Sequence, residues 1–185
     1  GYTIKVLNLD EKSNSNHYNP LMYIKEIKNF DDVLHKDINS HAIQEDDVMT
    51  LINTLMLNTK VETIDNTSGD PFWNKAEMLY LQALFYYTLR HYDKRHQNFT
   101  TILKLIRLSS PDNTGVSALD RLFDEWAKNE PDAIGVKRYK HFKVAASAPK
   151  MMSTIIMVAT ARLAAFNIKE IANLTDTDDM ELSRI

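Results

Sequence analysis

Residues 70–89 read DPFWNKAEMLYLQALFYYTL, and this stretch decides the fold of the chain. Asp70 is suited to be a helix N-cap, because its carboxylate can accept a hydrogen bond from a free backbone N–H, and Pro71 fits the first helical position. Apolar side chains then cover nearly every face of the predicted helix, at Phe72, Trp73, Ala76, Leu79, Tyr80, Ala83, Leu84, Phe85, Tyr86 and Tyr87. Such a helix is stable only when other helices surround it.

The composition favours a helical globular domain. The chain has 185 residues, 44% of them hydrophobic, which is enough for one domain with a sizeable core. Four glycines and five prolines supply little of the turn chemistry of β-sandwiches and barrels. Cysteine is absent, so neither disulfides nor thiolate metal sites form, which suits a reducing cytoplasm.

Two apolar stretches, 78–89 and 151–161, are too short to span a bilayer. Because the sequence opens with Gly-Tyr-Thr, we treat it as an excised segment without a targeting signal of its own.

Hydrophobic periodicity predicts an all-α fold, a compact bundle of about seven helices. Tyr2 to Leu7 alternate as in a strand, and residues 31–45 are expected to form a loop or a short helix. We expect N-caps at Asn98, Ser117 and Ser147. The predicted helices run from Asp46 to about Met56, Pro71 to about Tyr92, Asn98 to about Ile106, Ser117 to about Trp126, Asp132 to Ala146, Ser147 to Leu163, and Ile168 to Leu174.

Motifs for catalysis are missing or incomplete. The glycines stand alone, and none precedes Lys-Ser or Lys-Thr, so the chain has no phosphate-binding loop and is not itself expected to be an ATPase. Ser147 and Lys150 match the Ser-x-x-Lys pattern of penicillin-recognising enzymes, but the partner motifs are absent and a helix-capping role for Ser147 is favoured. No acid, base and nucleophile constellation emerges, so no catalytic residue is assigned.

Metal binding is not favoured either. His91 and His96 are five residues apart and fall on different helix faces, while His35, Asp37 and His41 are interpreted as solvated loop residues. We therefore predict no metal ligand. Glu77 lies inside the apolar helix, and we expect it to anchor a neighbouring loop or to pair with a basic residue, because a buried acid needs a partner.

Positive charge is concentrated in one part of the chain. Between residues 133 and 169 there are seven cations and no acid, so the remaining residues carry a net charge of −10 within a total of −3. Tyr139 and Phe142 are predicted to face inward, which turns the neighbouring cations towards solvent. This is either a solvated helix face or a surface for phosphates or an acidic protein, with candidate contact residues Lys137, Arg138, Lys140, Lys143 and Lys150.

Four motifs spread over the chain together resemble the type IV secretion coupling proteins of conjugative elements, particularly those of Gram-positive bacteria. They are Tyr18-Asn19-Pro20-Leu21, Gly69-Asp70-Pro71-Phe72-Trp73 with Lys75-Ala76-Glu77, Leu119-Asp120-Arg121-Leu122-Phe123, and Leu163-Ala164-Ala165-Phe166-Asn167.

The resemblance implies an all-α domain inserted into a nucleotide-binding domain. It assigns residues 1–27 to a strand and linker of the nucleotide-binding domain, 28–175 to the all-α substrate-recognition domain, and 176–185 to the return segment. ATP and Mg would be bound by the parent hexamer, and this fragment would hold no cofactor. The segment from His35 to Ile43 has no counterpart and is interpreted as a local insertion.

The implied function is recognition of transfer substrates and their delivery to the secretion channel. The expected partners are a relaxase or a relaxosome accessory protein, and single- or double-stranded DNA. The parent would be anchored at the cytoplasmic face of the cell membrane, and the isolated domain is expected to be monomeric. The alternative is a direct DNA-binding module that uses the basic stretch 137–150.

Overall fold

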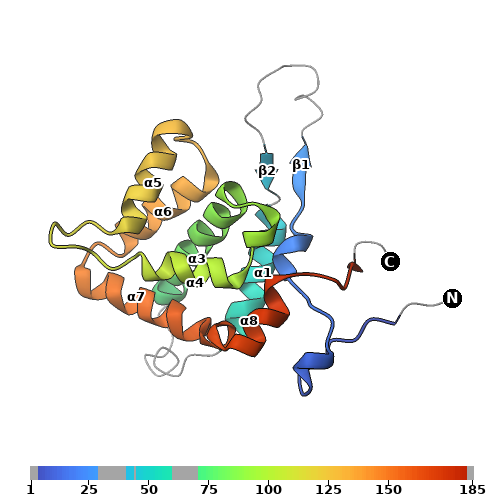
Figure 1. The fold of residues 1–185 in the computed structure, drawn as a ribbon. Coiled ribbons are helices and arrows are strands. Elements are labelled where there is room, and N and C mark those ends of the chain that lie inside the picture. The colour runs from blue at the N-terminus through green and yellow to red at the C-terminus, as the bar shows by residue number, and fades with distance from the viewer. Residues whose placement is uncertain (1–3, 29–40, 44, 60–70, 183–185) are drawn as a thin grey trace.

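The computed structural model describes residues 4–28, 41–43, 45–59 and 71–182. Seven α-helices lie in these residues, which confirms the predicted all-α bundle (Figure 1). They are α1 (Glu45–Asn58), α3 (Pro71–His91), α4 (Phe99–Arg107), α5 (Ala118–Asn129), α6 (Ile134–Ala145), α7 (Pro149–Arg162) and α8 (Lys169–Asp176).

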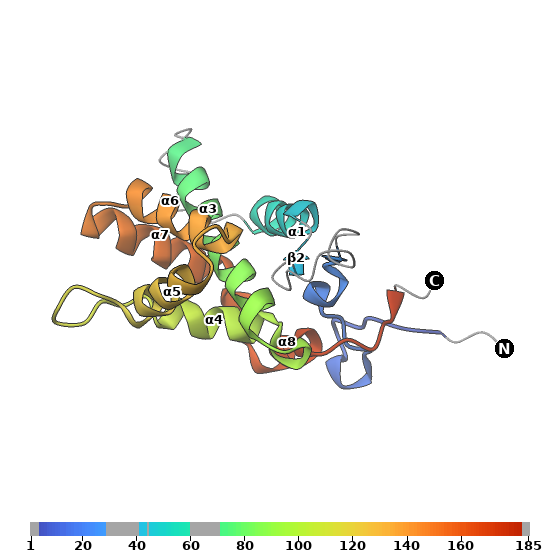
Figure 2. The same ribbon diagram turned by 90° about the horizontal axis from the view of Figure 1, so that it is seen from above.

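Helix α3 is the central element, as its sequence predicts. The helix begins at Pro71, whereas Asp70, its expected N-cap, lies outside the described residues. Helices α1, α4, α6 and α7 all pack against α3 (Figures 1 and 2). Five consecutive apolar side chains point to different faces of the helix, and all are buried. Ala83, Leu84, Phe85 and Tyr86 are 0% exposed, and Tyr87 is 8% exposed.

Helix α6 comes especially close to α3 because Gly135 has no side chain. A Cβ at this position would lie 2.4 Å from the ring of Trp126 on α5 and 2.9 Å from Cβ of Tyr86 on α3. Tyr139 and Phe142 of α6 face inward, as predicted, with 7% and 1% exposure. The close approach therefore fixes α5 and α6 against the central helix.

Of the three predicted N-caps that lie within the described residues, two are confirmed. The side chain of Asn98 accepts a hydrogen bond from the Thr101 N–H, and Ser117 forms a capping box with Asp120. The third is wrong, because α7 begins at Pro149 with Ala148 as N-cap and without a side-chain cap. Proline is most favourable at the first helical position, which puts the cap one residue after Ser147.

The strand structure differs from the prediction. Residues 4–8 have no regular secondary structure, and the remainder of the Tyr2 to Leu7 pattern lies outside the described residues. A small antiparallel pair forms elsewhere, between β1 (Glu26–Lys28) and β2 (His41–Ile43), with Ile27 opposite Ala42. Strands of three residues are too short for a period-two pattern to be recognised, so the sequence analysis missed them.

Glu77 has the basic partner that its position in the apolar helix predicts. Its carboxylate accepts hydrogen bonds from Nε and Nη2 of Arg162 at 2.7 and 2.8 Å. Both residues are buried, with 1% and 6% exposure. The remaining nitrogen, Nη1, donates to the carbonyl of Met56 at 3.1 Å and to that of Thr59, at the C-terminal end of α1. One guanidinium thus joins α7, α3 and α1.

Replacing Arg162 with Met should lower the free energy of unfolding by about 3–5 kcal/mol, since it leaves the buried Glu77 carboxylate without its partner. Equilibrium urea unfolding followed by tryptophan fluorescence measures this loss. The double variant Glu77→Leu/Arg162→Met should be more stable than Arg162→Met alone, because no buried charge remains. Arg107→Met, an exposed arginine change on α4, is the matched control. Equal stability of the single and double variants would contradict the prediction.

Candidate functional site

The two ends of the described chain lie side by side. The N-terminal segment (residues 4–19) and the C-terminal segment (residues 177–182) run along the same side of the bundle, at the right of Figures 1 and 2. The N–H of His17 donates to Oδ1 of Asp179 at 2.8 Å, and the Asp179 N–H donates to the His17 carbonyl at 3.0 Å. Lys5 Nζ also donates to the Asp179 carbonyl. The chain therefore enters and leaves the bundle at neighbouring points.

Asn19, the second residue of the Tyr18-Asn19-Pro20-Leu21 motif, connects these segments to the bundle. The residue is 0% exposed, and its Nδ2 donates to the carbonyl of Gln97 at 2.8 Å, in the connection between α3 and α4. Its Oδ1 accepts from the Leu21 N–H at 3.0 Å, and its own N–H donates to Oδ1 of Asp178. Asn-Pro is a turn signal, but the long-range partners have no local signature.

Exposed apolar side chains gather at the same end of the molecule. Among the described residues, twelve large hydrophobic side chains are exposed, and six of them belong to the first 22 residues or to the C-terminal segment. These six are Ile4, Val6, Leu7, Leu9, Met22 and Leu182. Scattered exposed apolar residues are normal, but such a concentration is typical of a surface that contacts another protein or domain.

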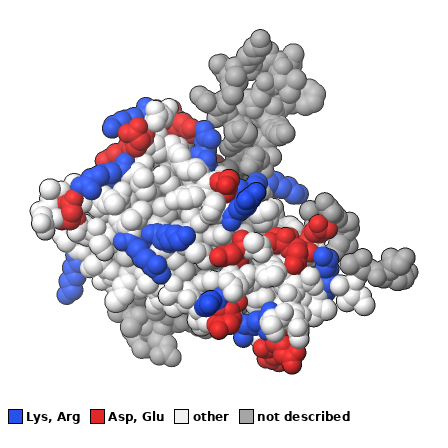
Figure 3. Space-filling view, viewed as in Figure 1, with Lys and Arg blue, Asp and Glu red and all other residues white. Residues whose placement is uncertain are grey.

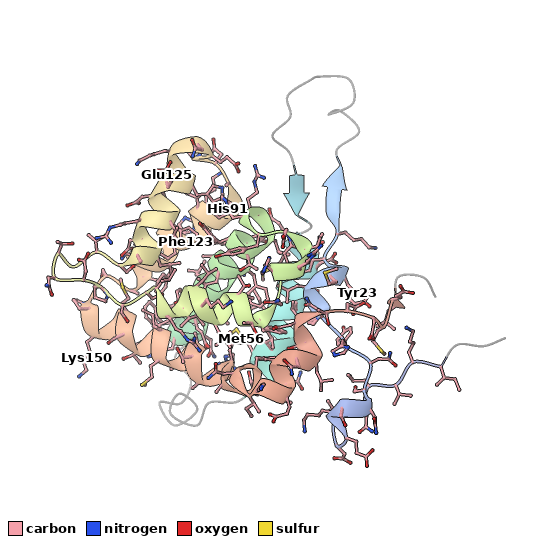
Figure 4. The ribbon with its side chains drawn as sticks, viewed as in Figure 1. Tyr23, Met56, His91, Phe123, Glu125 and Lys150 are labelled. Carbon is pink, nitrogen blue, oxygen red and sulfur yellow. The ribbon has the colours of Figure 1, made fainter. Side chains whose placement is uncertain are left out.

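The candidate contact residues lie on helices away from the N-terminal and C-terminal segments, although Arg138 reaches Glu45 at the start of α1. Helices α5 and α6 and the start of α7 occupy the left of Figures 1 and 2, away from both segments described above. Figure 4 shows Lys150 at this far end and Tyr23 beside the C-terminal segment. Lys137, Arg138, Lys140 and Lys143 lie on α6. The fold thus brings the predicted basic residues to two consecutive helices at the end distant from the chain's entrance.

The structure changes the electrostatic interpretation of this stretch. Acids distant in sequence approach two of the cations: Lys143 Nζ lies 2.7 Å from Oδ1 of Asp120 on α5, and an Arg138 nitrogen lies 3.9 Å from Oε2 of Glu45 on α1. Lys143 is also only partly exposed, at 35% of its side chain. Arg138 and Lys143 therefore remain only partly exposed, because the fold supplies acids that the local sequence lacks.

The other three cations are more accessible. Lys137 forms an exposed ion pair of 3.0 Å with Asp132, and such pairs contribute little to stability. Lys140 and Lys150 are exposed and have no ion pair within 4.0 Å among the described residues. On the face that Figure 3 shows, blue and red residues lie side by side over α5.

Asp120 is the best-satisfied carboxylate of this end. Burial alone would raise its pKa, but hydrogen bonds from Lys143, from the Ser117 N–H and hydroxyl, and from the Tyr139 hydroxyl outweigh burial and lower the pKa to about 2. The Tyr139 hydroxyl donates at 3.0 Å, and burial together with Asp120 raises the pKa of Tyr139. Lys143 therefore has a structural role that its sequence context did not reveal.

Other candidate sites gain no support. The described residues contain no group of three or more His, Cys, Asp or Glu side chains able to hold a metal ion. His35 and Asp37 lie outside the described residues, and the side chain of His41 is not described. Ser147 and Lys150 are both exposed. In the part of the chain that the structure covers, every helix is too short or too polar to cross a membrane.

The fold defines an all-α domain whose N-terminal and C-terminal segments lie side by side at one end. Comparison with protein families agrees with this class: the model of the family described as type IV secretory system conjugative DNA transfer matches residues 1–185. The chain belongs to this family. Searches of curated proteins and of solved structures gave no significant match.

Asp120→Asn should remove a pH-dependent part of the stability. Because the folded-state pKa is lower than the ordinary value of 3.8, ionised Asp120 stabilises the fold fully above about pH 4, and this contribution disappears as the pH falls towards 2. The free energy of unfolding of the wild type should therefore exceed that of the variant at pH 6, and the difference should shrink between pH 4 and 2. Parallel pH profiles of the two proteins would contradict the assignment.

Proposed function

We propose that this chain is the substrate-recognition domain of a conjugative coupling protein, which binds transfer substrates for delivery to a secretion channel. The observation that carries the proposal is the arrangement of the domain. The N-terminal and C-terminal segments, which in this proposal continue into neighbouring polypeptide, lie at one end, and α6 and the start of α7, with Lys137, Lys140 and Lys150, lie away from them. A domain built this way can hold cargo at one end while the other end stays attached.

In this proposal the nucleotide chemistry belongs to flanking polypeptide. Residues 1–27 and 176–185 are part of a nucleotide-binding domain that binds ATP and Mg, forms the parent hexamer, and sits at the cytoplasmic face of the cell membrane. Residues 28–175 bind substrate and do not hydrolyse ATP. The exposed apolar side chains at positions 4, 6, 7 and 9 support this division, because a sheet of the flanking domain would cover them.

The pairing of the cations supports a protein substrate, a relaxase or an accessory protein, over naked DNA. Nonspecific DNA binding gains affinity from the number of phosphates that free cations neutralise. Here Lys143 and Arg138 face acids of the domain itself, which leaves few free charges. Val144, which is 77% exposed on the same helix, offers an apolar contact that a phosphate backbone does not use but a protein does.

The purified chain should bind a relaxase or an accessory protein of its own conjugative element, measured by isothermal titration calorimetry. Lys140→Glu/Lys150→Glu should weaken binding at least about tenfold, because two accessible positive charges become negative. Lys104→Glu/Lys169→Glu, with two exposed lysines on α4 and α8, is the matched control and should bind as the wild type does. Absence of binding to every cognate transfer protein would refute the proposed function.

Direct DNA binding is the alternative, and a gel shift on single- and double-stranded oligonucleotides tests it. If DNA is the ligand, affinity should fall steeply with salt, by a slope of about 0.9 per contacted phosphate on duplex DNA. The variant Lys137→Glu/Lys140→Glu/Lys150→Glu should then lose binding; it spares Lys143, whose loss would disturb Asp120. Binding that survives in this variant would remove the basic stretch from consideration.

A further inference from the structure

The Asn19 side chain makes contacts that its role as a turn residue does not require. Capping the short helix that begins at Pro20 needs only Oδ1, which accepts the Leu21 N–H. The amide nitrogen reaches the Gln97 carbonyl at 2.8 Å, across 78 residues of sequence, and lies 3.5 Å from the carbonyl of Asp176 at the end of α8. One buried amide therefore contacts three separate parts of the chain.

The corner between α3 and α4, which contains Gln97 and Asn98, is also bonded to the C-terminal end of α8. Asn98, which caps α4 through its Oδ1, donates from Nδ2 to the carbonyl of Asp176 at 3.4 Å. The Gln97 side chain ties the corner back to α3 by donating to the carbonyls of Leu89 and Tyr92. The corner is thus bonded both to the central helix and to the segment that leaves the bundle.

A second set of contacts joins the N-terminal and C-terminal segments to each other. Asp178 accepts from the Asn19 N–H and, at 2.7 Å, from the Tyr23 hydroxyl. The Tyr23 hydroxyl in turn accepts from the Leu182 N–H at 3.1 Å. The Tyr18 N–H donates to the Leu174 carbonyl at 2.8 Å. Around Asn19, hydrogen bonds thus join the N-terminal part of the chain to the C-terminal segment and to α8.

We propose that Asn19 is a positioning residue that couples both segments to the α3–α4 corner, so that the helical bundle turns as one body with the polypeptide attached to it. This inference rests on the proposed function, in which the attached polypeptide is a nucleotide-driven motor. A domain joined by two free peptide linkers could swivel without moving its cargo. A domain held by a buried three-way hydrogen-bonded contact transmits rotation of its attachment to the far end, because packed helices move as rigid units.

Electron spin resonance distance measurements test the coupling on the full chain. The sequence contains no cysteine, so Ser13→Cys and Lys104→Cys place one spin label each on the N-terminal segment and on α4 without competing sites. Both positions are exposed. With Asn19 present, double electron–electron resonance should give one narrow distance distribution, since the segment and the corner are held together.

Asn19→Asp keeps an oxygen for the Leu21 N–H but replaces the donor to the Gln97 carbonyl with a repelling carboxylate. The distance distribution should broaden at least twofold in this variant, whereas the near-ultraviolet circular dichroism of the core aromatics should not change. Asn8→Ala is the matched control, because Asn8 accepts only from Asp10 and Glu11 nearby and should leave the distribution narrow. A folded Asn19→Asp protein with the wild-type distribution would overturn the proposal.

Hydrogen exchange of the unlabelled wild type gives a result even if the variant does not fold. The amides of Tyr18 and Asp179 should exchange at rates within about tenfold of the α4 amides, because the segments and the corner open together. Exchange of these two amides more than about a hundredfold faster than α4 would overturn the coupling. Neither experiment contains a relaxase or DNA. Failure of substrate binding would therefore refute the proposed function but would not test the coupling.

Discussion

The fold depends on the buried ion pair between Glu77 and Arg162. A charge placed inside an apolar helix is costly unless it is fully paired, and here each carboxylate oxygen receives one N–H of the same guanidinium. The third nitrogen satisfies the carbonyls of Met56 and Thr59 at the end of α1, where the Thr59 hydroxyl also donates to the Leu55 carbonyl. The pair thereby fixes the relative positions of α1, α3 and α7. Many aromatic rings of the core pack on the other side of α3, where Tyr87 contacts Phe123 and Trp126 of α5.

That frame separates two ends with different surface chemistry. Near the chain's entrance the surface carries exposed aliphatic side chains and hydrogen-bonded carboxylates, notably Asp178 and Asp179. Burial acts to raise the pKa of Asp179, but hydrogen bonds from His17 outweigh it and lower the pKa. The carboxylate bonds the N-terminal segment to the C-terminal segment through the His17 N–H. The far end carries the accessible lysines. In the proposed function, the first end serves attachment and the second serves binding.

Local signals in the sequence predict the helices and their caps well. The contacts that the sequence does not predict are those between side chains far apart in the chain. The apolar run of α3 and the caps Asn98 and Ser117 act within a few residues, so they can be read directly. Lys143 lies in a stretch without acids, yet its partner Asp120 is 23 residues away on another helix. The amide of Asn19 meets a carbonyl 78 residues away. A short stretch of sequence does not reveal partners this far away. They come together only when α5 packs on α6 and α8 packs on α4.

Charge segregation along a sequence therefore overstates charge segregation in space. The seven cations between residues 133 and 169 suggest a strongly basic surface, but Arg162 is buried on Glu77, Lys143 is bonded to Asp120, and Arg138 turns towards Glu45. What remains is a sparse set of lysines beside an exposed valine. In the proposed function, a surface of this kind would select its partner by shape and by a few placed charges, as protein interfaces do, whereas a nucleic acid backbone would demand a denser row of cations.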